Sequence, residues 1–138
     1  MHPILKNILA VVAGAVIGSF VNIMLVNLGP MVIPPPEGAD ITTMEGLEAT
    51  MHLFEPQHFI FPFLAHALGT LVGAVVAAMI AANRKQTYAI AIGVFFLAGG
   101  ILNVLWLPSP AWFNAIDLLF AYMPMGWLGF KVYEKIMK

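Results

Sequence analysis

The chain has 138 residues, of which 61% are hydrophobic and 9% are charged, and its mean hydropathy is +0.91. Soluble domains carry about 25% charged residues, so this composition excludes an ordinary soluble domain and predicts a single transmembrane domain over residues 1–138. The absence of cysteine excludes disulfides, thiolate nucleophiles and Cys-ligated metal centres. The net charge is −1 and no basic stripe occurs, so nucleic acid is not an expected partner.

Four apolar runs are each long enough to cross a hydrocarbon core about 30 Å thick as an α-helix. They cover residues 4–28, 59–82, 87–107 and 112–131. The first run follows a lysine, as in a signal peptide, but it is longer than a typical signal-peptide core and is expected to remain as a span. The predicted fold class is therefore an all-α integral membrane protein with four transmembrane helices in an antiparallel bundle.

Prolines mark the expected ends and bends of these helices. The first helix should stop at Gly29-Pro30, because proline lacks an amide hydrogen and pushes the preceding residue out of helical geometry. Residues 108–110, Pro-Ser-Pro, form a short connection that makes the last two helices antiparallel neighbours. Pro124 falls within the fourth helix and predicts a kink there, for which a structural role is favoured over a moving hinge.

Basic and acidic residues occupy different connections between the runs. The basic residues lie at the start of the first run, between the second and the third, or at and beyond the end of the fourth: Lys6, Arg84, Lys85, Lys131, Lys135 and Lys138. Five of the seven acids lie in the loop 29–58, which contains no Lys or Arg. Lysine and arginine beside span ends are retained in the cytoplasm. We therefore expect cytoplasmic N- and C-termini and an outside loop 29–58, in a plasma or inner membrane.

The outer loop is expected to contain a short amphipathic helix from Thr42 to Glu55. Its apolar residues recur at helical spacing, and these are Met44, Leu47, Met51 and Phe54. Thr42 and Glu45 fit a capping box at its start, and Pro56 supplies the stop. Such a helix is expected to lie on the outer membrane surface with its apolar side down.

The polar face of this loop allows a metal-site hypothesis. Glu48 and His52 are one helical turn apart and His58 follows nearby, so carboxylate and imidazole groups could together bind a divalent ion. The alternative is a solvated acidic face without a ligand, which is favoured because Gly46 and Pro56 make the segment a poor scaffold. No other cofactor is predicted.

Polar residues enter all four predicted spans near the same, outer end. This intramembrane polar layer consists of Asn22, His66, Asn103, Asn114 and Asp117. An aspartate at a helix centre costs about 2.5–3.5 kcal/mol on insertion, so Asp117 needs a partner, and His66 is the histidine at matching depth. Three interpretations of the layer are open: a polar knot that fixes helix register, a ligand or proton site that opens outward, or side chains that reach the membrane interface separately and never meet.

Small residues share faces with these polar residues, and such faces mark close helix contacts in membranes. The pairs Gly14-xxx-Gly18 and Gly69-xxx-Gly73 are the candidate packing motifs. Either motif could serve a contact within the chain or a homo-oligomer.

Three functions are compatible with these features. The favoured one is a small non-enzymatic accessory or assembly subunit that acts through helix–helix and outer-loop contacts, with the lipid bilayer and a membrane protein or a second copy of the chain as partners. An alternative is an oligomeric proton- or cation-linked transporter or channel in which His66 and Asp117 titrate. The second alternative is a metal-binding membrane enzyme that uses His52, His58 and His66. Serine nucleophile motifs, phosphate loops and HExxH are absent, so an enzyme has the least support.

Overall fold

The computed structural model describes residues 1–138 and is built from helices alone. The apolar runs form its long helices because a helix satisfies its backbone amides within one segment, which a membrane interior requires. The helices are α1 (Pro3–Val32), α2 (Met44–Thr50), η1 (Met51–Leu53), η2 (Pro56–Phe59), α3 (Ile60–Ile80), α4 (Lys85–Trp106), α5 (Ala111–Phe120) and α6 (Met123–Ile136).

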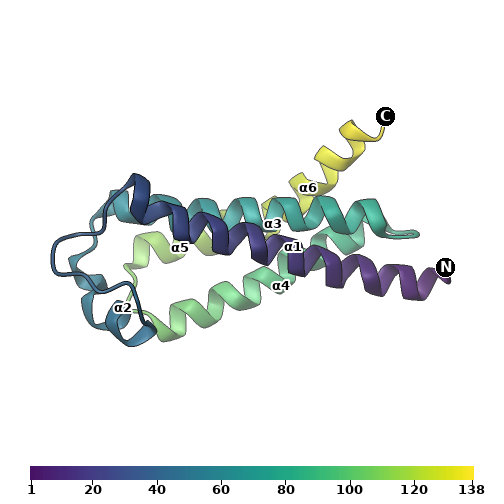
Figure 1. Ribbon diagram of the computed structural model, residues 1–138. Helices are drawn as coiled ribbons and strands as arrows, with labels where there is room; N and C mark the ends of the chain where they lie inside the picture. The colour runs from purple at the N-terminus through teal and green to yellow at the C-terminus, as the bar shows by residue number, and fades with distance from the viewer.

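Three helical segments are long and apolar enough to cross a membrane. They are Pro3–Val32, Pro56–Ile80 and Lys85–Trp106. These segments indicate a membrane protein and agree with the first three predicted spans. In Figure 1 both termini and the turn between α3 and α4 lie toward one end of the molecule, and α2 lies at the other. We call these the termini end and the loop end.

The segment predicted as one kinked helix, residues 112–131, is instead two helices. α5 ends at Phe120 and α6 begins at Met123, so Pro124 lies in the first turn of α6, where its missing amide hydrogen breaks no helical bond. Ala121 and Tyr122 between them are buried, with exposed fractions of 0% and 2%. The bend therefore follows from burying the Tyr122 side chain, and it turns α6 away from the direction of α5 (Figure 1).

The first helix does not stop at Gly29-Pro30 as predicted but continues to Val32. Pro30 removes one amide hydrogen, yet the amide of Ile33 donates to the Gly29 carbonyl at 2.8 Å and completes the last turn. Gly29 is buried against α3, where an added Cβ would lie 2.8 Å from the Phe61 Cβ. Packing against a neighbouring helix thus outweighs the local effect of proline.

The four glycines of the packing motifs all serve contacts within the chain. A Cβ added to Gly14 would lie 2.6 Å from the carbonyl oxygen of Gly73, and one added to Gly18 would lie 2.6 Å from the carbonyl oxygen of Gly69. Only glycine allows two helix backbones to approach this closely. The structure therefore uses both motifs to join α1 to α3.

The half of the bundle toward the termini end is densely packed. Its buried core is formed by small residues and one isoleucine: Ala74, Ala77, Ala78, Ala89 and Ile92. Asn7 closes this end by accepting a hydrogen bond from the Ala82 amide at 2.8 Å and donating to the Asn83 side chain at 3.1 Å. The Lys85 ammonium donates to the Ala78 carbonyl at 2.9 Å and also to the Ala81 carbonyl, so it satisfies the open end of α3.

Candidate functional site

The half of the bundle toward the loop end contains a cavity of about 620 Å³. Its walls come from the last turns of α1 and α4, the first turns of α3, and α5, and the loop between α1 and α3 covers it. In Figure 1, α1 and α4 diverge toward α2, which is the region that the cavity occupies. Its lining is mostly apolar, with a few polar side chains.

All five residues of the predicted polar layer line this one cavity. They are Asn22 from α1, His66 from α3, Asn103 from α4, and Asn114 and Asp117 from α5. The helices bring them together because each carries its polar side chain at the same depth and on the face that points into the bundle. The layer is therefore a single spatial cluster in the structure.

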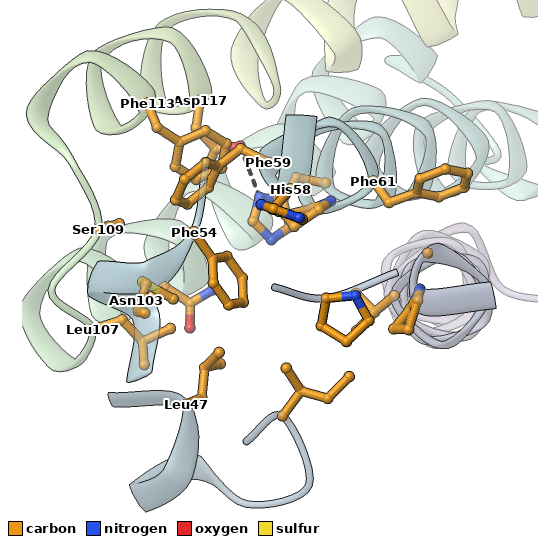
Figure 2. A pocket seen from close by; sticks show the side chains of 18 of the residues that line it. Leu47, Phe54, His58, Phe59, Phe61, Asn103, Leu107, Ser109, Phe113 and Asp117 are labelled. Carbon is orange, nitrogen blue, oxygen red and sulfur yellow. Dashed lines mark hydrogen bonds and ion pairs between the residues drawn. The ribbon is translucent and has the colours of Figure 1, made fainter. Parts of the chain in front are cut away.

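His66 and Asp117 are in direct contact. The Nδ1 atom of His66 lies 2.8 Å from Oδ1 of Asp117, and the dashed line at Asp117 in Figure 2 marks this bond. The two side chains are 16% and 5% exposed. A hydrogen bond at low exposure between these groups holds the imidazole in a fixed orientation.

Tyr122 completes this group, and the sequence interpretation did not include it. Its hydroxyl donates to Oδ2 of Asp117 at 2.8 Å, so each carboxyl oxygen of Asp117 has one partner. The Tyr122 ring also stacks on the His66 ring, with centroids 5.8 Å apart. One signal was available in the sequence: Tyr122 lies mid-run, whereas membrane tyrosines favour the interfaces.

Several polar side-chain atoms at the cavity have no protein partner. The Oδ1 atom of Asn22 is buried without a hydrogen bond. The Nε2 atom of His66 also bonds to no protein group, while its Nδ1 is held by Asp117, but the His66 side chain is 16% exposed and Nε2 is not fully buried. Buried polar groups are usually hydrogen-bonded, so Asn22 Oδ1 marks a place where a bound molecule or water would supply the missing partner.

The remaining two asparagines differ in their environment. Asn114 is tied to the turn between α4 and α5, because the Ser109 hydroxyl donates to its Oδ1 and its own Nδ2 donates to the Ser109 carbonyl at 3.3 Å. Asn103 lines the cavity without a side-chain hydrogen bond to protein and is drawn on the α4 side of Figure 2. Asn114 is thus structural, and Asn103 is free to contact a ligand.

Of the segment predicted as one helix from Thr42 to Glu55, residues Met44–Thr50 form α2, and this helix covers the cavity. α2 ends at Thr50 and the single-turn helix η1 follows it. All four residues of the predicted apolar stripe line the cavity, and Met51 is buried against Phe59 and Phe113. Figure 2 shows Leu47 and Phe54 from the loop on the same side as Leu107 and Phe113. The apolar stripe therefore contributes to the wall of the cavity.

The start of the loop helix also differs from the prediction. Thr43, not Thr42, is the N-cap, and its hydroxyl accepts from the Gly46 amide at 2.9 Å. The Thr42 hydroxyl donates to Asp40 at 2.6 Å and the Thr42 amide donates to the same carboxyl at 3.0 Å. These two bonds hold the pKa of the Asp40 carboxyl below its usual value, because they stabilise the ionised form. Asp40 and Thr42 thus form a local turn that precedes the helix.

The three residues of the metal-site hypothesis are not gathered into a site. Glu48 and His52 are exposed, and no group of three or more His, Asp or Glu side chains has the geometry to hold a metal ion. His58 turns away from them, because its Nδ1 accepts from the Glu55 amide at 2.8 Å and its ring packs on Phe54. His58 lines the cavity instead (Figure 2).

The charges around the cavity are few. Asp117 is the one carboxylate in its lining, the two imidazoles are those of His58 and His66, and no Lys or Arg contributes. An anionic headgroup would find no fixed positive charge there. The cavity can therefore accept an apolar body and hydrogen-bond a polar head.

Comparison of the chain with protein-family models, with curated proteins and with solved structures finds no match. Function must therefore be argued from the site itself.

Proposed function

We propose that this membrane protein binds a small amphipathic molecule in the cavity beneath the loop. One observation carries the proposal: the His66–Asp117 pair, with side chains 16% and 5% exposed, faces a cavity of about 620 Å³ whose lining is mostly apolar. Small-molecule sites are typically concave, about 300–1,000 Å³ in volume, and apolar with a few well-placed polar groups. The apolar part of the ligand would contact the phenylalanines, and its polar head would contact the polar layer.

The unpaired atoms favour ligand binding over a purely structural knot. A knot that only fixes helix register gains most when every buried polar group has a partner, since partly satisfied networks cost stability. Asn22 Oδ1 is buried and has none, although Asp117 is fully paired. A ligand that donates a hydrogen bond to Asn22 Oδ1 removes that cost.

Other functions have less support from the geometry. The accessory-subunit hypothesis depended partly on the small-residue faces, and these are occupied by contacts between α1 and α3. A transport path through one chain would have to pass the packed alanines and Ile92 at the termini end. A metal-binding enzyme lacks a gathered set of ligands.

We further propose that α5 and α6 together make a fourth membrane crossing, which completes a four-helix bundle with the loop helix above it. Neither helix is long enough to cross alone, but residues 111–136 follow one another from the loop end toward the termini end. With the basic residues at the termini end, the termini lie in the cytoplasm and the loop lies outside. The cavity then opens in the outer half of the membrane, where lipid-soluble and external molecules both have access.

The experiment that tests the binding function is native mass spectrometry of the protein released from membranes or mild detergent. We expect a small molecule to remain bound to the wild type. Val104 lines the cavity from α4, so Val104→Phe should fill part of it and remove the bound mass. Leu105 is the matched control, because it is the next residue, is 73% exposed and does not line the cavity. Wild-type protein without any bound molecule, or equal retention in Val104→Phe and Leu105→Phe, would contradict the proposal.

A further inference from the structure

We infer that the ligand carries an uncharged carbonyl, as in a ketone, ester, amide or quinone, and that the Nε2–H group of His66 donates a hydrogen bond to it. This inference rests on the proposed function and adds the chemical class of the ligand. It follows from the way Asp117 and Tyr122 surround one side of the imidazole and leave the other side to the cavity.

The protons of the His66–Asp117 pair have three possible arrangements. In the first, ionised Asp117 faces an imidazolium, which carries a hydrogen on both ring nitrogens. In the second, a protonated Asp117 donates to Nδ1, so the neutral imidazole carries its hydrogen on Nε2. In the third, ionised Asp117 accepts from Nδ1 of a neutral imidazole, and Nε2 is a bare acceptor. The first two arrangements have no net charge, whereas the third is a net anion.

The surroundings favour the two neutral arrangements. The Asp117 side chain is 5% exposed, and the cavity lining contains no Lys or Arg that could compensate a net negative charge. A buried charge without a counter-charge is strongly disfavoured in a low-dielectric environment. Both neutral arrangements place a hydrogen on Nε2. The cavity therefore presents a hydrogen-bond donor at this point, and the ligand atom that meets it must be an acceptor.

The same lining restricts the charge of the ligand. A carboxylate or phosphate head would lie near the Asp117 carboxylate without a lysine or arginine to pair with. An ammonium head has no lone pair for the Nε2–H group, and both oxygens of Asp117 are already occupied by His66 and Tyr122. A neutral carbonyl oxygen satisfies the donor without adding charge. Asn22 and Asn103 do not restrict whether the ligand head is a donor or an acceptor, since a side-chain amide can donate or accept a hydrogen bond.

The body of the ligand is apolar and in contact with aromatic rings. Phe59 and Phe113 pack with ring centroids 4.7 Å apart, and Phe54 lies beside them at 5.7 Å from Phe59. Figure 2 shows these rings with Leu47 and Leu107 around one side of the cavity, and Asp117 beyond them. A carbonyl on an alkyl or ring-bearing chain fits this division into a polar inner part and an apolar outer part.

The test uses four probes that share a chain and differ in the head: 2-tridecanone, 2-aminotridecane, tridecanoic acid and tridecane. The protein is embedded in nanodiscs of ether-linked lipids, which contribute no ester carbonyls. Apparent affinity is measured from the rise of the unfolding temperature with probe concentration at pH 7. The carbonyl stretch of 2-tridecanone labelled with ¹³C at the carbonyl is recorded by infrared difference spectroscopy.

We expect 2-tridecanone to bind about tenfold more tightly than tridecane, as one added hydrogen bond in a desolvated site allows. Its carbonyl band should move to lower wavenumber on binding, and His66→Phe should remove both the affinity gain and the band shift. The amine and the acid should bind no more tightly than tridecane. If His66→Phe does not fold, His66→Phe/Asp117→Asn removes both members of the pair, and the carbonyl band position in the wild type still tests the hydrogen bond.

Tighter binding of the amine would mean that Nε2 is a bare acceptor, and tighter binding of the acid would mean that an uncompensated imidazolium faces the cavity. Either result overturns the inference, as does an unshifted carbonyl band. If tridecane binds in a manner sensitive to Val104→Phe and 2-tridecanone has no advantage, the binding site stands and only the ligand class is wrong. If no probe binds, the proposed function fails as well.

Discussion

Tyr122→Phe removes a single hydroxyl from the buried group around Asp117 and keeps the ring that stacks on His66. That hydroxyl is one of two partners of the carboxyl group, at 2.8 Å from Oδ2, and Tyr122 is only 2% exposed. A buried acceptor that loses a partner costs about 1–3 kcal/mol. We therefore expect the free energy of unfolding to fall by about 1–3 kcal/mol, because neither the ring volume nor the backbone changes.

The assay is reversible unfolding in mixed detergent and SDS, followed by circular dichroism, for both single variants and the double variant with Asp117→Leu. In the Asp117→Leu background the hydroxyl has no acceptor, so Tyr122→Phe should cost nothing or become stabilising. A coupling of about 0.5–3 kcal/mol is expected for groups in contact. The matched control is Tyr88→Phe, since the Tyr88 hydroxyl makes no hydrogen bond, and its effect should stay within about 0.5 kcal/mol. Equal losses for Tyr88→Phe and Tyr122→Phe, or strict additivity with Asp117→Leu, would refute the buried hydrogen bond.

Three further predictions concern packing and the loop. Gly73→Ala should destabilise the protein, because its Cβ would lie 2.6 Å from the Gly14 carbonyl, whereas Gly99→Ala meets nothing within 4 Å and should be neutral or stabilising in the same unfolding assay. Thr42→Val should raise the pKa of Asp40 toward its usual 3.8 in an NMR titration, because it removes the side-chain hydrogen bond that is the largest cause of the lowered value. The folded-state pKa is depressed, so the stabilisation of the turn is present above the unfolded value and is lost as pH falls through the folded one. The protection factors of amides near Asp40 should therefore fall there, and unchanged protection factors in acid would contradict this. Met51→Ser should increase hydrogen exchange across α2, since Met51 is the buried anchor of the loop, and unchanged protection would mean that other contacts hold it.

The cavity has a floor formed by the helices and a cover formed by the loop, and this arrangement indicates where a ligand would enter. Its floor includes His66 and Asp117, and both carboxyl oxygens of Asp117 are paired, one with His66 and the other with Tyr122 behind it. Its cover is the loop with α2 and η1, which contacts the bundle mainly through Met51 and its apolar neighbours. Few buried contacts hold the cover, so opening there should cost less free energy than opening between helices. Ligand exchange is therefore expected to depend on the loop.

The membrane character of the protein follows from its sequence alone. Long apolar runs must become helices in lipid, because the backbone has no water to bond to, and this reasoning holds whatever the helices pack against. The same reasoning predicted the polar layer: an aspartate is costly in a predicted span, so Asp117 was expected to need a partner at the same depth, and His66 was the available one. The length and composition of an apolar run, and the position of a polar residue within it, are local properties of the sequence. They can therefore be obtained from the sequence alone.

Only the tertiary structure shows where packing outweighs the local preference of the sequence for a helix end or a continuous helix. Pro30 lies inside α1 because Gly29 packs on Phe61, and the break at Ala121 exists because the Tyr122 side chain is buried against Asp117. The glycine motifs allowed either an internal contact or an oligomer until the Gly14 and Gly73 backbones were seen together. The cavity has no sequence signature, since it is the space left where α1 and α4 diverge and the loop folds over them. Such features depend on contacts between residues far apart in the chain, and neither hydrophobic period nor spacing encodes those distances.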